Sequence, residues 1–441
     1  MKTAAIKISN SFRLVHVQIA LLILLVFGTL KAQQRDVQRL VAENGIGGSY
    51  SYSSTSYGKF LTPANDDLGK LQHTLENLWT NLGEPVANAT ETYNAILTNA
   101  VYTPMQQQQR HNHTKEITLL THTGTSKLDN LWRQIRWWNG PSCVGMYLKS
   151  LQDIEAFVAF LEAHKEDLFP SSSSSMAKYP TTFHVMLEKT LLGYPHNILR
   201  NLVMDHSETD YFLAMDVDFV TSPNAHDGLL GLLQSDPAII ERLHHRWLFV
   251  LPAFELLQIK HPHNNSFLTH SDGTRVSPTE DMLPRTKEEV LARKQNNTLL
   301  IFHIQQGKAH RPTRFDLWEK KDLEATFYTV EYEGTFEPYV LGYRKGVPRL
   351  WTEFRGFGFN KVSWFTELHR AGYQFASLRD FWVVHMNHPV SKAVKKEFSE
   401  RNRPYLGSFM KYLKDHYAPV QKEKATSIPP WVKRNNNKNK K

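Results

Sequence analysis

Cysteine is almost absent from this chain of 441 residues, which contains only Cys143. A single cysteine cannot form a disulfide within the chain, and zinc modules built on paired C-x-x-C motifs are excluded as well. Charge is also sparse, because charged residues make up 22% of the sequence and leave a net charge of +9, much of it at the two ends. This balance favours an anionic partner over nucleic acid.

Several common catalytic motifs are missing. The sequence has no G-x-x-x-x-G-K-[ST], no G-x-S-x-G and no H-E-x-x-H, and Gly356-Phe-Gly358 lacks the third glycine of a dinucleotide fingerprint. P-loop, serine-hydrolase, zincin and NAD-binding functions are therefore disfavoured. The 41% of hydrophobic residues is nevertheless enough for a full-sized core in one to three domains.

The N-terminus is typical of a segment that targets a protein to the secretory pathway. Lys2, Lys7 and Arg13 precede an apolar stretch that ends at Leu30, so residues 1–32 form a signal peptide or a signal anchor. Cleavage after Ala32 would place Leu30 where a small residue is preferred, which favours a retained type II anchor over secretion. Either way the body of the protein is translocated, and four glycosylation sequons agree with this, at Asn88, Asn112, Asn264 and Asn296.

Composition divides the rest of the chain. Residues 33–115 are polar, with serine- and glutamine-rich runs, and are predicted to form a stem that includes a helical stretch near Leu68–Leu82. A globular domain is predicted over residues 116–415, with a polar surface insertion at about 260–285, and residues 416–441 form a basic tail.

Helical and extended patterns alternate within this domain. Strands are predicted at 117–121, 142–148, 182–187 and 211–215, and helices at 127–137, 151–164, 197–204 and 227–233. Such alternation predicts an α/β fold with a mostly parallel sheet flanked by helices.

The most informative chemistry is Asp216-Val-Asp218. Two carboxylates two residues apart, directly after a buried strand, point the same way at the carboxyl edge of the sheet, where open α/β folds bind ligands. A Mg²⁺ or Mn²⁺ held by such carboxylates completes its shell with substrate phosphate and water. The pattern therefore predicts a metal-diphosphate site, with a solvated pair of loop carboxylates as the alternative.

Longer blocks carry a family resemblance. The sequence resembles glycosyltransferase family 49, which includes β-1,4-glucuronyltransferase and the second catalytic domain of LARGE-type xylosyl/glucuronyltransferases. The matching blocks fall in the family's order over about residues 115–390: Tyr194–Asn201, Asp210–Val220, Phe249–Glu255, Gly307–Phe315, Phe336–Tyr339, Phe354–Lys361 and Phe381–Pro389.

The resemblance implies a GT-A fold, an inverting transfer from a UDP-sugar to a glycan or glycoprotein acceptor, a Mn²⁺ or Mg²⁺ cofactor, and a Golgi membrane location with a luminal catalytic domain. Glucuronate is the donor sugar that it favours. N-acetylglucosamine, xylose or galactose is the alternative within this class, and an inactive luminal glycan-binding protein is the alternative from another class. Only one catalytic block is present.

The resemblance also assigns site residues. Asp216 and Asp218 resemble the metal and diphosphate pair, and His385 resembles a late histidine that joins them on the metal; a buried core histidine is its alternative. Arg200 could bind a phosphate or a glucuronate carboxylate, or instead pair with Asp210 or Glu208. The remaining implied donor contacts are Asn197, Gly356 and Gly358, the two glycines because they let the backbone pass close to a sugar.

An inverting transfer needs a base for the acceptor hydroxyl. In related galactosyltransferases a glycine-rich loop leads into this carboxylate, but here Gly356-Phe-Gly-Phe-Asn360 ends in an amide. The candidates are then Glu367, Glu255 and Glu337, each of which could instead be capping or ion-pairing. Nearby aromatics could form a sugar-stacking platform or a core beneath the loop: Trp351, Phe354, Phe357, Phe359 and Trp364.

Overall fold

The structure is a computed structural model. It describes residues 55–57, 68–82, 93–102, 116–169, 179–189, 193–256, 278–303, 309–320, 325–386 and 392–417. The predicted address segment 1–32, most of the predicted insertion and nearly all of the basic tail lie outside these residues. None of the helices described is both long enough and apolar enough to cross a bilayer.

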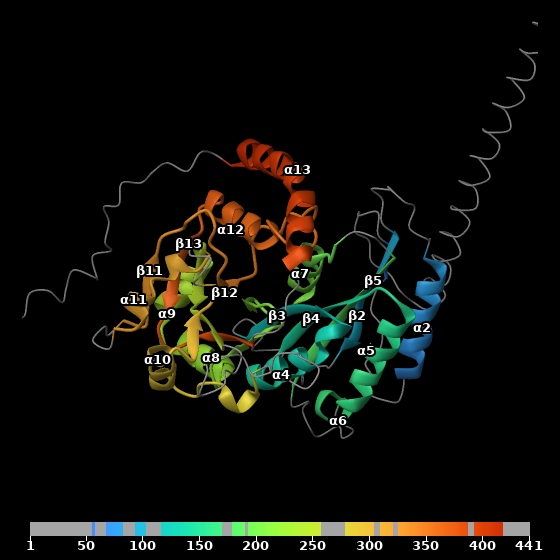
Figure 1. The fold of residues 1–441 in the computed structure, drawn as a ribbon, viewed down its shortest axis with the longest axis horizontal. Coiled ribbons are helices and arrows are strands. Elements are labelled where there is room, and N and C mark those ends of the chain that lie inside the picture. Colours follow the sequence, from blue (N-terminus) through green and yellow to red (C-terminus); the bar gives the residue numbers. More distant parts are fainter. Residues whose placement is uncertain are drawn as a thin grey trace, which may run out of the picture.

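A ten-stranded sheet forms the centre of the described fold (Figure 1). Its spatial order is β1 (Thr55–Tyr57), β2 (Tyr93–Tyr102), β5 (Thr181–Lys189), β4 (Ser142–Leu148), β3 (Ile117–Gly124), β6 (Tyr211–Ala214), β12 (Tyr339–Tyr343), β8 (Trp247–Leu251), β13 (Gln374–Leu378) and β11 (Phe327–Val330). The strands predicted within residues 117–215 are confirmed, and β3 and β4 are buried along almost their whole length. The α/β class is therefore confirmed.

The large sheet is mixed: its central strands and the outer pairs β1–β2 and β8–β13 are parallel, and its other pairs are antiparallel. Strands β5, β4, β3 and β6 run parallel, as the alternation of strands and helices requires. Beyond them, β12 runs antiparallel to both β6 and β8, and β2 runs antiparallel to β5. Gly342 permits the close insertion of β12, because a Cβ there would lie 2.6 Å from Phe212 and from Leu248.

A second sheet of four strands lies beside the first, in the order β10 (Leu299–Ile301), β9 (Ala253–Leu256), β14 (Val383–Met386) and β7 (Phe219–Thr221). The chain passes from the large sheet to this one three times, from β6 to β7, from β8 to β9 and from β13 to β14. Residues 215–218 form the first of these crossings, so the Asp216-Val-Asp218 segment lies where the two sheets meet.

Helices cover the sheets. They are α2 (Leu68–Asn81), α4 (Leu128–Trp138), α5 (Leu151–Ala163), α6 (Lys165–Leu168), α7 (His196–His206), α8 (Ala225–Ser235), α9 (Pro237–His244), α10 (Lys287–Gln295), α11 (Phe315–Trp318), α12 (Asn360–Arg370) and α13 (Lys392–His416), with 3₁₀ turns η2 (Thr125–Lys127), η3 (Glu280–Met282) and η5 (Arg311–Thr313). Local chemistry fixes several starts. The Ser150 hydroxyl accepts the Asp153 amide at the start of α5, and Asp236 caps α9 before Pro237.

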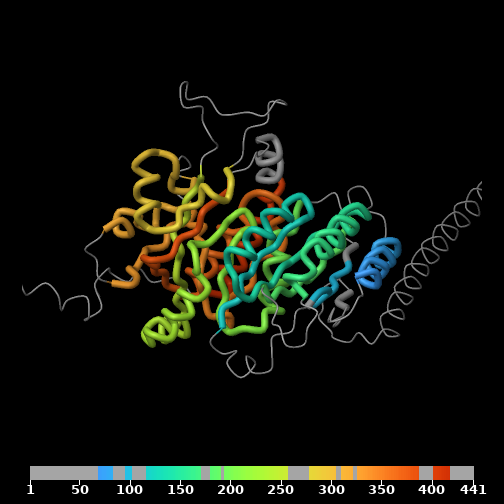
Figure 2. Tube along the Cα trace, turned by 90° about the horizontal axis from the view of Figure 1, so that it is seen from below, coloured from blue at the N-terminus to red at the C-terminus, as the bar shows by residue number. Residues whose placement is uncertain are grey.

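Part of the predicted stem is packed into the fold. Leu71 and Leu75 of α2 join the same core cluster as Phe157 of α5, and Leu97 of β2 packs in it as well. Figure 2 shows α2, in blue, at the edge of the molecule beyond the green helices. The folded unit therefore includes segments upstream of residue 116. The prediction of a stem over residues 33–115 rests on its polar composition and its serine- and glutamine-rich runs.

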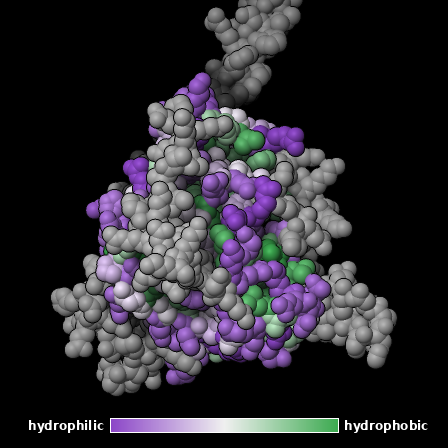
Figure 3. Space-filling view, turned by 90° about the vertical axis from the view of Figure 1, so that its left-hand side faces the viewer, coloured by the Kyte–Doolittle hydropathy of each residue, from purple (hydrophilic) through white to green (hydrophobic). Residues whose placement is uncertain are grey.

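The surface and the core separate as expected for a globular fold. The coloured part of the face in Figure 3 is mostly hydrophilic, with apolar side chains scattered among polar ones. Cys143 lies in the core, where burial raises the pKa of its thiol. Packing without disulfides therefore holds this fold together.

Candidate active site

The turn between β6 and β7 carries the two carboxylates that the sequence singled out. The backbone amide of Phe219 donates to the carbonyl of Asp216 at 3.1 Å, which closes the turn. The buried Gln134 side chain of α4 donates to the carbonyls of both Asp216 and Phe219 at 2.8 Å. The Gln134 amide therefore holds the turn in place, so the two carboxylates are rigidly positioned.

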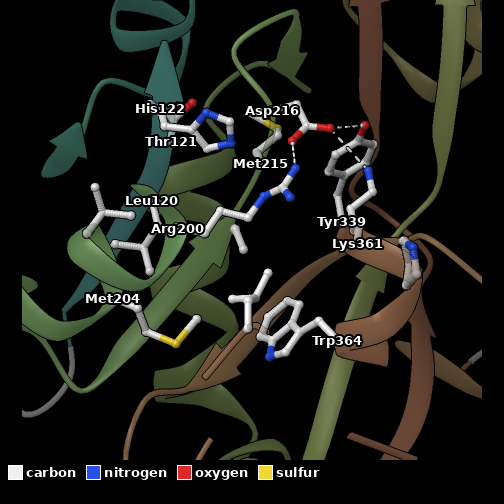
Figure 4. Close-up of a pocket in the computed structure, with 14 residues that line it drawn as sticks. Leu120, Thr121, His122, Arg200, Met204, Met215, Asp216, Tyr339, Lys361 and Trp364 are labelled. Carbon is white, nitrogen blue, oxygen red and sulfur yellow. Dashed lines mark hydrogen bonds and ion pairs between the residues drawn. The ribbon is translucent and has the colours of Figure 1, made fainter. Parts of the chain in front are cut away.

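Asp216 is surrounded by donors. Arg200 Nη2 of α7 lies 2.8 Å from its Oδ1, while the Tyr339 hydroxyl and Lys361 Nζ lie 3.0 and 3.1 Å from its Oδ2. Figure 4 shows Arg200 and Lys361 reaching the carboxylate from different sides. Burial alone would raise the pKa of Asp216, but Lys361 and Arg200 hold it well below its ordinary value. Asp216 is therefore a carboxylate that stays charged.

Asp218 faces the other side of the turn. Lys127 Nζ lies 2.5 Å from its Oδ2, and Asn130 Nδ2 lies 2.9 Å from its Oδ1. Both partners come from the segment η2–α4, which follows the carboxyl end of β3. Two carboxylates and three cations thus lie around one turn.

His385 reaches the same region from the second sheet. It pairs in register with Phe219 of β7 on one side and with Glu255 of β9 on the other. Its ring packs against Phe219 and Phe302 with centroids 4.9 Å apart in each case, and the next amide, of Met386, donates to the carbonyl of Asp218 at 2.9 Å. The structure therefore places His385 beside the Asp218 backbone.

The side chains around the Asp216–Asp218 turn can be assessed as ligands for a metal ion. Among the described residues, no three His, Cys, Asp or Glu side chains are grouped closely enough to hold a metal ion. The two carboxylate oxygens of Asp218 accept from Lys127 and Asn130. These oxygens are the hard ligands that Mg²⁺ and Mn²⁺ prefer. The pair thus suits a cation that takes its other ligands from a substrate.

Asn197 lies where it was predicted, one helix before the pair. It is fully buried, and its Nδ2 donates to the carbonyls of Trp351 and Asn360 at 2.8 and 3.0 Å. Its Oδ1 accepts from Arg200 at 3.1 Å. The Asn197 amide therefore orients Arg200, and a direct contact of Asn197 with the donor stays a prediction. Arg200 itself pairs with Asp216, not with Asp210 or Glu208, the partners we had considered.

Gly356 and Gly358 lie in the loop that leads into α12. Both have positive φ, +65° and +95°, and the Gly356 amide donates to the carbonyl of Tyr194 at 2.8 Å. Asn360 ties this loop to the site, because its Nδ2 donates to the Gly356 carbonyl and its Oδ1 accepts from Arg200. The prediction of close backbone approach at these glycines stays a prediction.

The three candidate bases lie in different environments. Glu367 is 2% exposed beneath α13, where its Oε1 accepts from the hydroxyls of Tyr412 and Tyr417, both at 2.9 Å. This enclosure argues against Glu367 as the base. Burial raises the pKa of Glu255, which lies beside His385, and also that of Glu337, on which Lys361 and Asp216 act with opposite sign. Glu337 therefore interacts with Asp216, and Glu255 lies on the strand beside His385.

A pocket opens beneath Asp216 (Figure 4). Apolar side chains from β3, α7 and α12 line it together with Arg200, Lys361 and His122. Burial, followed by the positive charge of Arg200, lowers the pKa of His122 well below its ordinary value, so this ring is neutral. No described residue hydrogen-bonds to its Nε2.

Sequence reasoning missed several residues of this site. Lys127, Asn130 and Gln134 stand in a helix that we read only as a core element, and nothing in their spacing indicates a ligand. Tyr339 and Lys361 could have been found, since each ends a block that carries the family resemblance.

Comparison with known families decides the relationship. Residues 162–418, more than half of the chain, match the family described as glycosyl-transferase for dystroglycan, glycosyltransferase family 49. The chain belongs to this family. The family predicted from the sequence blocks is thereby confirmed, and the Asp216–Asp218 turn, Arg200, Lys361 and His385 all fall inside the region matched.

Individual relatives in family 49 are distant. The chain is 26% identical over 362 residues to the chicken (Gallus gallus) xylosyl- and glucuronyltransferase LARGE1, covering 77% of this chain and 43% of that protein. It is 27% identical to the human (Homo sapiens) LARGE1, covering 68% and 37%, and 28% identical to the zebrafish (Danio rerio) beta-1,4-glucuronyltransferase 1, covering 60% and 57%. The chain thus spans less than half the length of the LARGE1 relatives it matches.

Solved structures are less similar. A crystal structure of GalNAc-T7 with UDP, GalNAc and Mn²⁺ has a TM-score of 0.36 and 9% identity, over 68% of this chain and 49% of that one. The S. aureus protein TarS, residues 1–349, has a TM-score of 0.31 and 11% identity, over 67% and 73%.

Proposed function

We propose that this chain is a metal-dependent glycosyltransferase of the GT-A type that moves a sugar, glucuronate in the favoured case, from UDP to a hydroxyl of a glycan acceptor with inversion. One observation carries the proposal: two carboxylates on a rigid turn between two sheets, those of Asp216 and Asp218, are in contact with Lys127, Arg200 and Lys361. Membership of family 49 supports glycosyl transfer as the reaction class.

The charges of the site favour an anionic donor. Three cations, Lys127, Arg200 and Lys361, contact the two carboxylates. A divalent ion would add positive charge at this turn, and a nucleoside diphosphate would compensate it. A uronate brings one more carboxylate than a neutral sugar, and the planar guanidinium of Arg200 is suited to bind a carboxylate. Glucuronate therefore matches the site better than N-acetylglucosamine, xylose or galactose.

A metal would be held by Asp218, and the other candidate ligands are Asp216 on the same turn and His385 on the neighbouring strand. Asp218 is the more direct candidate, as the resemblance to the family implies. When bound, Mn²⁺ or Mg²⁺ supplies charge compensation for the departing diphosphate. Lys127 and Lys361 stand on either side of the turn, where they can contact phosphate oxygens.

The transfer itself requires a base. The acceptor oxygen attacks the anomeric carbon, the bond to the phosphate oxygen breaks, UDP departs, and the hydroxyl proton passes to a carboxylate. Glu337 and Glu255 suit this role, because burial raises the pKa of each, Glu337 interacts electrostatically with Asp216, and Glu255 pairs in register with His385. Glu337 is favoured, since the charges of Lys361 and Asp216 both influence its pKa.

We propose a Golgi membrane location with the domain in the lumen, and secretion as the alternative. The support is the basic and apolar N-terminal sequence together with the sequons. Asn296 stands at the exposed C-terminal end of α10, where a glycan can be accommodated.

The proposal is tested with the full-length chain in detergent and a panel of nucleotide sugars. Release of UDP is measured with Mn²⁺, with chelator, and with and without aryl glycoside acceptors. Release from UDP-glucuronate that chelator abolishes is the expected result. Release from a different donor would replace glucuronate, and glycan binding without release from any donor would instead support an inactive glycan-binding protein.

A further inference from the structure

One side chain of the pocket beneath Asp216 has a buried hydrogen-bonding atom that the fold does not use. His122 of β3 is 6% exposed and lines this pocket together with Arg200 and Lys361. Its Nε2 is buried, and no described residue hydrogen-bonds to it. Leaving a buried polar atom unsatisfied is costly, so this nitrogen requires an explanation.

The position of the His122 ring is fixed by its neighbours. Its Nδ1 lies 3.1 Å from the Tyr194 hydroxyl, and the ring packs edge-on against that of His196, with centroids 5.4 Å apart. Figure 4 shows the ring extending from β3 toward the contact between Arg200 and Asp216. His122 therefore holds a defined place at the charged end of the pocket.

The hydrogen bond to Tyr194 decides which ring nitrogen carries the proton. Burial raises the pKa of the Tyr194 hydroxyl well above its ordinary value, so the hydroxyl keeps its proton. Among the described residues, His122 Nδ1 is the one hydrogen-bond partner of this hydroxyl. Donation to Nδ1 gives the hydroxyl proton an acceptor, and the neutral ring then carries its own proton on Nε2. We therefore assign Nε2 as a donor.

Arg200 brings further donor capacity to the same pocket. Its hydrogen bonds to Asn197, Asn360 and Asp216 all come from Nη1 and Nη2, and its Nε donates to no described residue. The two side chains also interact electrostatically, since the charge of Arg200 helps to lower the pKa of His122. The pocket thus combines a permanent positive charge, a neutral donor and apolar walls.

The size and polarity of the pocket indicate which chemical group it would bind. Its volume is about 30 Å³, which admits a group of a few atoms and not a whole nucleoside or diphosphate. A guanidinium beside a second donor favours a small planar anion, and a carboxylate is such a group. A hydroxymethyl group could accept a hydrogen bond, but it carries no charge to attract Arg200.

We propose that His122 selects a uronate donor, because its Nε2–H and the Arg200 guanidinium together bind the carboxylate of the sugar. This inference rests on the proposed function and names a residue that determines its specificity. Asp218 and Lys127 lie at the other side of the turn and remain for the metal and the diphosphate. The two anionic parts of the donor would then have separate partners.

The test compares three variants of the full-length chain in detergent. His122→Asn keeps an acceptor for the Tyr194 hydroxyl but has no N–H at the place of Nε2, whereas His122→Gln keeps an N–H near that place. His206→Asn is the control, since His206 lies on α7 as Arg200 does but does not line the pocket. Titration calorimetry with Mn²⁺ measures the affinity of each protein for UDP-glucuronate and for UDP-glucose.

We expect wild type to prefer UDP-glucuronate and His122→Asn to lose about tenfold of this preference, with its affinity for UDP-glucose unchanged. His122→Gln and His206→Asn should keep the preference. The unchanged affinity for UDP-glucose also reports that His122→Asn is folded. His122→Phe, which keeps the ring volume, is a second variant with the same expected loss.

The outcomes separate this inference from the proposed function. Equal affinity of wild type for the two nucleotide sugars, or a wild-type preference in His122→Asn and His122→Phe, overturns the role of His122. A parallel fall of both affinities in these variants overturns it too, because the histidine then only supports the fold. A preference that depends on His122 without transfer to any acceptor would refute the proposed reaction and support the selection of a uronate.

Discussion

Arg200 Nη2 and Asp216 Oδ1 lie 2.8 Å apart, and this contact joins α7 to the turn after β6. The same guanidinium donates from Nη1 to Asn197 and Asn360, so one side chain positions the carboxylate, the helix and the loop before α12. A planar fork with several donors can serve these acceptors at once, whereas an ammonium group cannot reproduce the arrangement.

Arg200→Lys should therefore lower turnover while the protein stays folded. We expect a loss of about tenfold to a hundredfold in UDP release, because the charge remains but its geometry is lost. Arg349→Lys is the control, since Arg349 forms an exposed pair with Asp205 on the outside of α7. Equal turnover in the two variants would show that the Arg200 contact only stabilises the fold.

Asp218→Ala should abolish transfer with folding retained. Removing the carboxylate deletes the proposed oxygen ligand and leaves Lys127 without this partner, and a loss of at least about a hundredfold is expected. Asp205→Ala, at an exposed position, is the control. Mn²⁺ titration followed by protein thermal shift measures metal binding apart from activity. Normal turnover of Asp218→Ala would refute the metal assignment.

Glu337→Gln should remove the base. Raised pKa values at Glu337 and Glu255 mean that activity falls as pH decreases through a value above the ordinary 4.5, because the base must be unprotonated. We expect Glu337→Gln to lower kcat by about 10²–10⁴-fold and to abolish this acidic limb.

Two comparison variants complete the base assignment. Glu367→Gln should change stability more than kcat, since its carboxylate is enclosed by Tyr412 and Tyr417. If Glu255→Gln loses the acidic limb and Glu337→Gln keeps it, the base is Glu255.

The parallel centre of the fold could be predicted because local signals agree there. The helices α4, α5, α7 and α8 and the strands between them follow their apolar periodicity, and βαβ units leave parallel pairing as the outcome. The pairing of β12 could not be predicted, since it depends on Gly342 fitting between Phe212 and Leu248, residues distant in sequence.

The candidate site, like the fold, contains residues that could be predicted from the sequence and residues that could not. Asp216 and Asp218 could be predicted from a local pattern, but the cations that surround them arrive from three separate elements. The roles of Asn197 and Glu367 were obscured for a similar reason. Each is polar and close to the site in sequence, yet its partners are Asn360 in one case and Tyr412 and Tyr417 in the other, which only the folded chain brings near.

Arg355→Met should destabilise the protein strongly. It leaves the fully buried Glu188 carboxylate without its cation, which costs about 3–5 kcal/mol in the free energy of unfolding. The double variant Arg355→Met with Glu188→Gln should recover part of this loss, because no unpaired charge remains. Urea unfolding measures both. Additive effects of the two changes would contradict a coupled buried pair.

His184 predicts how stability depends on pH. Burial lowers the pKa of this fully buried ring well below 6.5, and its Nδ1 accepts the Asn99 amide at 3.0 Å, so the folded state keeps it neutral. The unfolded chain binds the proton instead, so stability falls as pH decreases below about 6.5, by about 1.4 kcal/mol per pH unit for this group.

His184→Asn should keep an acceptor near the Asn99 amide while removing the titration. Urea unfolding of both proteins between pH 7 and pH 5.5 measures the difference, and the variant should show the shallower decline. Other buried histidines, His122 and His310, also have lowered pKa values and remain in both proteins, so the variant retains part of the slope. Parallel pH profiles would mean that His184 is protonated alike in the folded and unfolded states, contrary to its buried, hydrogen-bonded position.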